Sequence, residues 1–220
     1  MPIGIQLAHA GRKASTQRPW QGDGPLAAAE GAWPCIAPSP EPYNEGRHRP
    51  EALDREGMKS VIGEFTQAVA RAERLGFDLI EIHAAHGYLL SEFLSPLANQ
   101  RSVEYGGSLE NRMRFPLEVA GAMRAAWPAD RPMGARINAT DWLQGGITTP
   151  EAIAFAAALE EIGLDFVCVS SGGNSAEAKI PATPGYQVAL AAEIKAATGL
   201  AAMAVGLIGV ADDRRADRLT

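Results

Sequence analysis

The sequence predicts an α/β protein of the (β/α)8, or TIM, barrel type, present here in incomplete form. Short apolar runs alternate with longer helical patterns, which indicates parallel strands joined by right-handed crossovers. Polar residues recur where the strands end, as expected around one barrel mouth. An open doubly wound sheet is disfavoured because no strand is followed by a G-x-G-x-x-G turn. Five strands are recognisable, whereas a closed barrel needs eight.

The composition fits one globular domain over residues 1–220, with 46% hydrophobic residues, 21% charged residues and a net charge of −6. This acidic balance argues against nucleic-acid or membrane partners, since no positive surplus exists to neutralise phosphates. No apolar stretch reaches the ~18 residues of a membrane-spanning helix, and no signal peptide opens the chain. Cys35 and Cys168 are far apart and are interpreted as free thiols. We therefore expect a cytoplasmic protein.

The first predicted strand spans residues 3–8 and contains one polar residue that breaks its apolar pattern, Gln6. Residues 9–50 then hold many of the 15 prolines and the aromatic residues Trp20, Trp33 and Tyr43, with no helical period. A loop of this length inside a compact domain is usually functional or disordered. Its aromatic residues favour packing over a site.

The first long helix is predicted from its ends and its periodicity. Asp54 is a suitable N-cap, and apolar residues follow it at three- and four-residue spacing. Gly76 ends the helix. The elements expected after it alternate in the same way and are, in order, a strand at 77–82, a short helix to 94, a helix at 109–127 kinked or restarted at Pro116, a strand at 133–137, a helix from Thr149 to 162, a strand at 166–170, a helix at 188–197 and a strand at 201–205.

The segment HAAHGY, directly after the strand at 77–82, is the main candidate for a site. It places His83, His86 and Tyr88 within six positions at a strand end, where barrel enzymes carry their active-site residues. A metal site is disfavoured because no third ligand of suitable type accompanies the two histidines. The histidines could also simply satisfy backbone groups at the strand end.

Several blocks of the sequence resemble the Old Yellow Enzyme family of FMN-dependent ene-reductases, in the version of bacterial NADPH dehydrogenases and xenobiotic reductases. The matching blocks are IGIQLAHAGRKAS, HAAHGYLLSEFLSPLANQRSVEYGGSLENRMRF, GARINATDWLQGGIT, SSGG, PGYQ and AVGLI, in this order between residues 3 and 208. The resemblance implies an oxidoreductase that binds FMN and transfers hydride from NADPH or NADH to the C=C bond of α,β-unsaturated carbonyl compounds. It further implies a ping-pong cycle, small-molecule enone substrates and a homo-oligomer.

The resemblance assigns a role to particular residues. Gln6 would hydrogen-bond the pyrimidine edge of the flavin, and the fixed charge of Arg136 would lie by N1 and the C2 oxygen, where it favours the reduced flavin. Gly172 and Gly206, with Gly173 beside the first, would approach the ribityl chain and the phosphate. Arg136 could instead form an ion pair with Asp141 or Glu81.

The three residues of the HAAHGY segment would act on the substrate. His83 and His86 would donate hydrogen bonds to the substrate's carbonyl oxygen, and Tyr88 would protonate the α-carbon as a general acid. Lys13 and Arg12 are either solvated loop charges or contacts to substrate and NADPH phosphate.

The sequence also departs from the family pattern. Val103 precedes Glu104 where the family usually has an acidic residue, and the resemblance ends after Ile208. The chain is expected to correspond to about strands three to seven of the barrel. This leaves a second hypothesis, a truncated non-catalytic fragment that cannot retain FMN, because the missing strands would expose sheet edges. A phosphate-binding lyase or isomerase is disfavoured because no lysine lies at a strand end to form a Schiff base.

Overall fold

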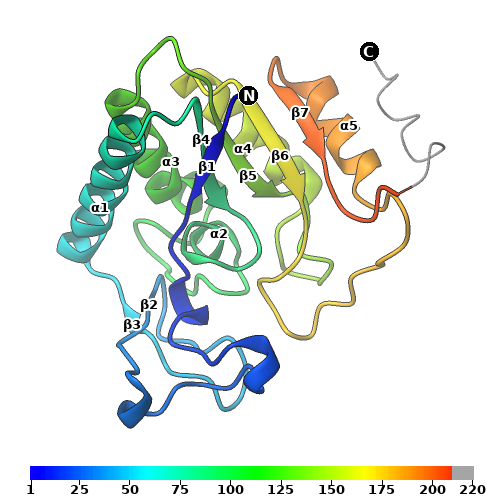
Figure 1. The fold of residues 1–220 in the computed structure, drawn as a ribbon. Helices are drawn as coiled ribbons and strands as arrows, with labels where there is room; N and C mark the ends of the chain where they lie inside the picture. The colour runs from blue at the N-terminus through cyan, green and yellow to red at the C-terminus, as the bar shows by residue number, and fades with distance from the viewer. Residues whose placement is uncertain (210–220) are drawn as a thin grey trace.

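The computed structural model describes residues 1–209, and its centre is one parallel sheet of five strands in the order β1-β4-β5-β6-β7 (Figure 1). The strands are β1 (Gly4–Leu7), β4 (Leu79–Ala84), β5 (Met133–Asn138), β6 (Phe166–Ser170) and β7 (Ala201–Ala204). Every neighbouring pair is parallel. Consecutive strands lie side by side with a helix on most connections, so the sheet has the strand order of a barrel wall and not of a doubly wound sheet.

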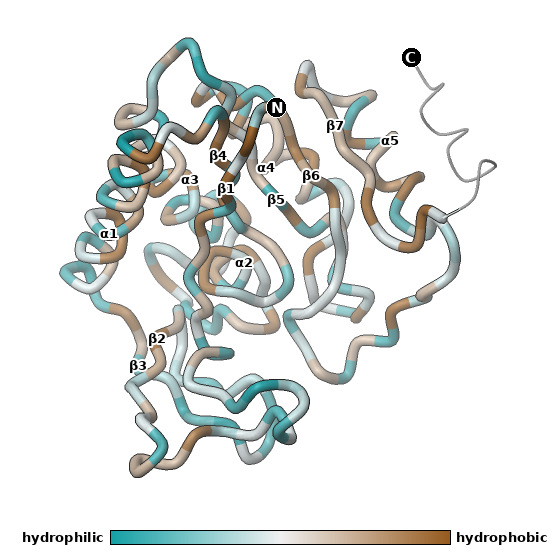
Figure 2. The backbone as a smooth tube through the Cα atoms, viewed as in Figure 1, coloured by the Kyte–Doolittle hydropathy of each residue, from teal (hydrophilic) through white to brown (hydrophobic). Residues whose placement is uncertain are grey.

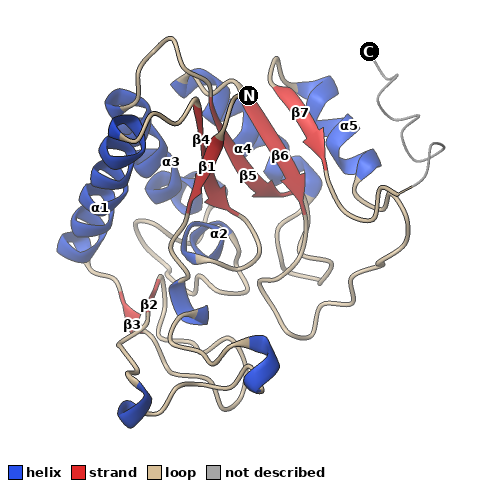
Figure 3. Ribbon diagram, viewed as in Figure 1, coloured by secondary structure: helices blue, strands red, loops and turns tan. Residues whose placement is uncertain are grey.

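Four helices cover one face of the sheet, and their ends follow the capping residues in the sequence. They are α1 (Arg55–Arg74), α3 (Leu109–Ala126), α4 (Thr149–Ile162) and α5 (Val188–Ala197), which pack in this order around the outside (Figure 3). The carboxylate of Asp54 accepts the N–H of Gly57 at 2.7 Å, which confirms the predicted N-cap. Gly76 and Gly163 follow helix ends with left-handed φ angles of 79° and 92°.

Side-chain alternation along the strands separates the hydrophobic core from the opposite, concave face. Ile80 and Ile82 of β4 are 0% and 2% exposed and belong to the core between sheet and helices. The residues that alternate with them along β4, Leu79, Glu81 and His83, point to the other face of the sheet. Figure 2 shows the hydrophobic stretches concentrated in the strands and the inner sides of the helices. The concave face therefore carries the polar chemistry.

The connections at the carboxyl ends of the strands form a layer below the sheet in Figure 1. Residues 9–50 are largely irregular there, as expected, with three short 3-10 turns and the two-residue strands β2 (Ile36–Ala37) and β3 (Glu51–Ala52), which the sequence did not predict. The short helix α2 (Leu89–Leu94) lies beneath the sheet and was predicted. Arg101 ties the layer together by donating to the Pro38 carbonyl at 2.8 Å.

Of the two outcomes predicted for Pro116, the start of a second helix was wrong, and a kink in the helix stays a prediction. Pro116 lies inside α3 without dividing it, because a proline removes one backbone donor from a helix that is otherwise held by buried packing. The expected loss of family character after Ile208 falls almost wholly on residues 210–220, which lie outside the described residues. Within residues 1–209, no helix is both long and apolar enough to cross a membrane.

Candidate active site

The loop after β4 brings the three candidate catalytic residues to the carboxyl edge of the sheet. His83 belongs to β4 itself and is 5% exposed, while His86 and Tyr88 follow on the loop and are partly buried. His86 adopts a left-handed backbone conformation, with φ of 60°, and its N–H donates to the side-chain oxygen of Asn138 at 3.1 Å. A non-glycine residue held in this conformation marks a loop whose shape is set by its surroundings.

The two imidazoles form a chain of hydrogen bonds that fixes their tautomers. His83 Nδ1 accepts the N–H of Ala85 at 3.2 Å, so a neutral His83 carries its proton on Nε2. That nitrogen lies 3.2 Å from His86 Nδ1, and His86 Nε2 lies 2.6 Å from Ser170 Oγ. With both rings neutral, His83 donates to His86 and His86 donates to Ser170. Each ring thus presents one N–H that a ligand oxygen could take over.

Tyr88 completes the cluster. Its ring lies edge-on to His83, with the ring centroids 4.9 Å apart, and His83 lies edge-on to His86 at 5.0 Å. The structure therefore brings together two imidazole donors and a phenol, the arrangement expected of an oxygen-binding and proton-donating site.

Arg136 stands next to this cluster, and burial together with its charge keeps both histidines neutral. It pairs in register with His83 on β4 and with Cys168 on β6, so its side chain shares their face of the sheet. Burial, followed by the positive charge of Arg136, lowers the pKa values of His83 and His86 to about 4. At neutral pH both imidazoles are thus uncharged hydrogen-bond donors.

The guanidinium of Arg136 has little to bind within the described chain. Its Nη2 contacts Ser170 Oγ at 3.5 Å, and its buried Nε has no hydrogen-bond partner. Among residues 1–209, no ion pair joins Arg136 to Asp141 or Glu81; Asp141 instead accepts from Ser95 at 2.6 Å. A half-buried cation with an unpartnered Nε on a concave face suits an anionic or carbonyl-rich ligand.

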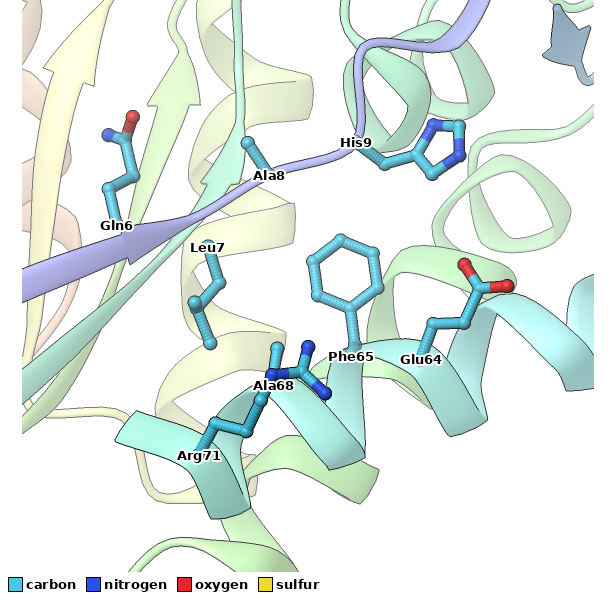
Figure 4. Close-up of a pocket in the computed structure, with 8 residues that line it drawn as sticks. All are labelled: Gln6, Leu7, Ala8, His9, Glu64, Phe65, Ala68 and Arg71. Carbon is cyan, nitrogen blue, oxygen red and sulfur yellow. The ribbon is translucent and has the colours of Figure 1, made fainter. Parts of the chain in front are cut away.

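Gln6 lies on the same face but one step nearer the amino ends of the strands. It pairs in register with Glu81, and its amide donates to the Glu81 carboxylate at 2.5 Å. Figure 4 shows Gln6 and Leu7 on opposite sides of β1, with Leu7 facing Phe65 of α1. A cavity of about 460 Å³ opens on the concave side, lined by Gln6, Glu81 and the apolar side chains of Leu79, Phe166 and Met203 among others.

A second hollow, of about 360 Å³, lies between β1 and α1 on the helix side of the strand (Figure 4). Glu64 and Arg71 of α1 and His9 at the end of β1 provide its polar groups. Gln6 also lines this hollow, whereas His83, His86, Tyr88 and Arg136 do not.

Gly172 and Gly206 follow β6 and β7 at the same edge of the sheet as His83. Both have left-handed φ angles, 73° and 97°, so neither position accommodates a side chain without strain. A Cβ atom at Gly172 would lie 2.7 Å from the side chain of Ile180, and one at Gly206 would lie 2.6 Å from the amide of Gln187. The contacts that restrict both glycines are therefore with the protein itself, and their contact with a phosphate stays a prediction.

The residues present fit a flat aromatic cofactor with polar edges. The concave face combines an unpartnered guanidinium nitrogen, an exposed amide on β1 and an apolar cavity floor, which are the donors and the surface that an isoalloxazine ring uses. No group of three or more histidine, cysteine, aspartate or glutamate residues within 1–209 could hold a metal ion.

Sequence reasoning missed one supporting residue, Asn138, and named a second, Lys13, without its partners. Asn138 fixes the His86 backbone, and the two-residue alternation from Arg136 on β5 could have indicated its side. Lys13 contacts main-chain oxygens of two other loops, a relation between segments 73 and 160 residues apart that local patterns do not reveal.

Comparison with known proteins shows the family of this chain. The model of the NADH:flavin oxidoreductase / NADH oxidase family, an FMN family, matches residues 2–218. This match continues past Ile208, where the sequence blocks had suggested that the resemblance stops. The NADPH dehydrogenase of Bacillus velezensis is 46% identical over 206 residues, which are 94% of this chain and 56% of that protein.

Two solved structures share the fold. Morphinone reductase superposes with a TM-score of 0.72 at 26% identity, covering 99% of this chain and 58% of its own. An old yellow enzyme homologue from Zymomonas mobilis gives a TM-score of 0.74 at 22% identity, covering 100% of this chain and 61% of its own. The chain thus spans somewhat more than half the length of the relatives that it matches.

Proposed function

Because this chain belongs to the NADH:flavin oxidoreductase / NADH oxidase family of FMN-dependent oxidoreductases, we propose that it supplies the substrate-binding half of an ene-reductase. The proposed reaction is hydride transfer from NADPH or NADH, through FMN, to the C=C bond of an α,β-unsaturated carbonyl compound. The observation that carries this proposal is the neutral His83–His86 pair with Tyr88 beside it, on the same sheet face as Arg136.

Arg136 and Gln6 are the residues that would hold the flavin ring, with Gly172 and Gly206 near its ribityl phosphate. When bound, FMN accepts hydride from the nicotinamide and delivers it to the substrate. The half-buried guanidinium of Arg136, whose Nε has no partner, would stabilise negative charge on the ring because a fixed cation attracts it more strongly where water is partly excluded. Gln6 would offer an amide to the ring's polar edge.

His83 and His86 would bind the carbonyl oxygen of the substrate. Their N–H groups now point to His86 and Ser170, so an incoming oxygen must replace those acceptors. Neutral imidazoles suit this role because they donate without transferring a full proton to the oxygen. Tyr88 would then give its proton to the substrate carbon opposite the hydride.

A second candidate is a non-catalytic fragment that cannot retain FMN. It is favoured by the sheet edges, since within residues 1–209 β1 and β7 each pair with one strand only. In addition, the match covers only 56% of the Bacillus velezensis relative. Cofactor contacts supplied by the rest of such a relative would be lacking.

The first test is to mix the purified chain with FMN, remove free flavin by gel filtration and record the visible spectrum of the protein peak. Retained flavin, followed by NADPH-dependent reduction of 2-cyclohexenone, would support the enzyme. A colourless, folded protein would support the fragment.

Arg136→Met should lower FMN affinity by at least about tenfold, whereas the matched control Arg71→Met, on the exposed side of α1, should not.

We also propose that the chain is cytoplasmic and self-associates. Both cysteines are buried free thiols, as is usual in a reducing compartment. The unpaired strand edges favour association of copies.

A further inference from the structure

Lys13 lies where three loops of the candidate site meet. It ends the 3-10 turn Gly11–Lys13, which follows β1. Its ammonium donates to the main-chain carbonyl of His86 at 2.8 Å and to that of Gly173 at 2.6 Å. The first carbonyl belongs to the loop after β4 and the second to the loop after β6. One side chain thus joins the ends of β1, β4 and β6.

The two loops that Lys13 joins are packed backbone against backbone. A Cβ atom at Gly173 would lie 2.6 Å from the His86 carbonyl oxygen, and a Cβ at Gly87 would overlap the Gly173 carbonyl. Only glycines permit this approach. Because two carbonyl oxygens lie close together here, a cation between them offsets their mutual repulsion.

The turn that carries Lys13 is itself fixed by buried contacts. The N–H of Arg12 donates to the carboxylate of Glu92 at 2.8 Å, and Glu92 is 0% exposed. The guanidinium of Arg12 donates to the Asn174 carbonyl at 2.6 Å. The Lys13 stem is therefore anchored on the turn at one end while its ammonium is held at the other.

The ammonium also faces aromatic rings of the site. It lies 4.2 Å from the centre of the Tyr43 ring and 5.7 Å from that of Tyr88, which are cation–π distances. Burial lowers the pKa of Lys13 to about 8, and the nearby Glu92 carboxyl opposes this shift. These contacts contradict the first alternative from the sequence, a solvated charge, whereas a contact of Lys13 with substrate or NADPH phosphate stays a prediction.

We propose that Lys13 is a positioning residue, which clamps the loops after β4 and β6 through the carbonyls of His86 and Gly173 and so holds the His86 imidazole and Tyr88 in place. Its effect on substrate reduction rests on the proposed function. The clamp itself is a property of the chain and needs no cofactor.

The clamp is tested first in the chain without flavin, by amide hydrogen exchange. Lys13→Met removes the charge and both hydrogen bonds while keeping the apolar stem. We expect amides of His86 and Tyr88 to exchange at least about tenfold faster, as loss of two charged hydrogen bonds implies, while α4 keeps its protection. Lys59→Met, which removes an exposed lysine paired with Glu56 on α1, is the matched control. Unchanged exchange in the HAAHGY segment would overturn the proposal.

A spectroscopic readout separates positioning from general loss of structure. The nitrogen-15 signals of the imidazoles report tautomer and hydrogen bonding, so Lys13→Met should alter those of His86 while leaving His48 unchanged. Lys13→Arg, which keeps a cation and several donors, should restore at least part of the His86 signature. If Lys13→Met does not fold, Lys13→Arg and Lys13→Gln are compared instead, and equal His86 signals in both would contradict the clamp.

Kinetics then connect the clamp to the reaction. In the FMN-loaded chain, Lys13→Met should weaken binding of a phenol such as 4-hydroxybenzaldehyde about tenfold and slow substrate reduction more than flavin reduction. Equal slowing of both steps would contradict positioning of His86. If the wild-type chain retains no FMN, the proposed function fails, whereas hydrogen exchange and the imidazole signals still decide the clamp.

Discussion

His83 and His86 are kept neutral by their surroundings, and this neutrality defines the chemistry of the site. Burial removes water from both rings, and Arg136 adds a positive charge on the same sheet face. Both effects disfavour the imidazolium form. The pair therefore offers two uncharged N–H donors throughout the physiological pH range, which a substrate oxygen can accept without becoming protonated.

The same pKa shifts predict how stability depends on pH. As pH falls below about 6.5, histidines of the unfolded chain take up protons, while His83 and His86 in the folded chain stay neutral until about pH 4. At these two sites the unfolded state then binds more protons, so the contribution of the two histidines to the free energy of unfolding should fall between these two pH values. Glu92, whose pKa is raised to about 8 by burial, acts in the opposite direction and is the same in wild type and variant. Urea unfolding at pH 7, 6 and 5 measures this slope. The double variant His83→Gln/His86→Gln should flatten it, and an unchanged slope would contradict the shifts.

Tyr88→Phe tests the proposed proton donor because it removes only the phenolic hydroxyl. The variant keeps the ring that packs edge-on against His83 and removes only the hydroxyl. Substrate reduction should slow by about 10²-fold or more, a typical contribution of general acid catalysis, while flavin reduction by NADPH should be nearly unchanged. Stopped-flow measurement of the two half-reactions separates these steps. Equal losses in both would remove Tyr88 from the role of acid.

The site residues that lie at the end of a predicted strand could be predicted from the sequence. The residues that bind to distant loops could not. His83, His86 and Tyr88 follow a recognisable strand, and the structure brings them together. The roles of Gln6, Gly172 and Gly206 toward the cofactor stay predictions. Lys13 was left between two alternatives because its partners are main-chain oxygens far along the chain, and a carbonyl has no signature in a sequence.

The loops after β4 and β6 approach each other backbone to backbone, and Gly87 shows that this contact leaves no space for a side chain. It has a φ of 67°, and a Cβ there would overlap the Gly173 carbonyl. Gly145 has a similar φ of 81° with nothing within 4 Å. The two glycines share the backbone strain of an alanine substitution and differ in the steric clash.

Comparing Gly87→Ala with Gly145→Ala therefore isolates the clash. Gly145→Ala should reduce the free energy of unfolding by about 1–2 kcal/mol, the cost of a left-handed alanine. Gly87→Ala should cost roughly 3 kcal/mol or more because the loops must also separate. Denaturant unfolding of both variants measures the difference. Equal losses would mean that the two loops separate at no cost.

Elements with strong local signals agreed with their prediction, and elements decided by packing did not. The helix Val188–Ala197 and the N-cap Asp54 were predicted correctly. The strands β2 and β3 pair across a loop. Each has only two residues, which is too short for any periodic pattern in the sequence. A second helix beginning at Pro116 was one of the two expected outcomes because proline lacks a backbone donor, whereas buried neighbours such as Phe115 and Val119 keep α3 continuous.

The outer strands β1 and β7 are the edges at which copies of the molecule would pair under the proposed self-association. Within residues 1–209 each has one paired and one unpaired side. In β7, the N–H of Ala201 donates inward to Asp165, so the alternation of a parallel ladder directs the N–H of Ala202 to the free side. Such an edge can pair with another chain.

Two proline substitutions in β7 compare its free side with its paired side. Ala202→Pro removes a donor on the free side and should lower self-association by several-fold, with little loss of stability. Ala201→Pro removes the bond to Asp165 and should destabilise the protein by about 1 kcal/mol or more. Light scattering over a dilution series, with thermal unfolding, distinguishes the two. Association that is insensitive to Ala202→Pro would place the contact elsewhere.

The pairing of β1 with β4 also affects the order in which the strands pair during folding. Gln6 and Glu81 are 75 residues apart, whereas Arg136 and Ser170 are only 34 apart. Each doubling of a loop adds about 0.6 kcal/mol of closure entropy, so the pairing of β5 with β6 has an entropic advantage over that of β1 with β4. We therefore expect β1 to dock late in folding, onto a surface where the histidine pair and Arg136 are already gathered.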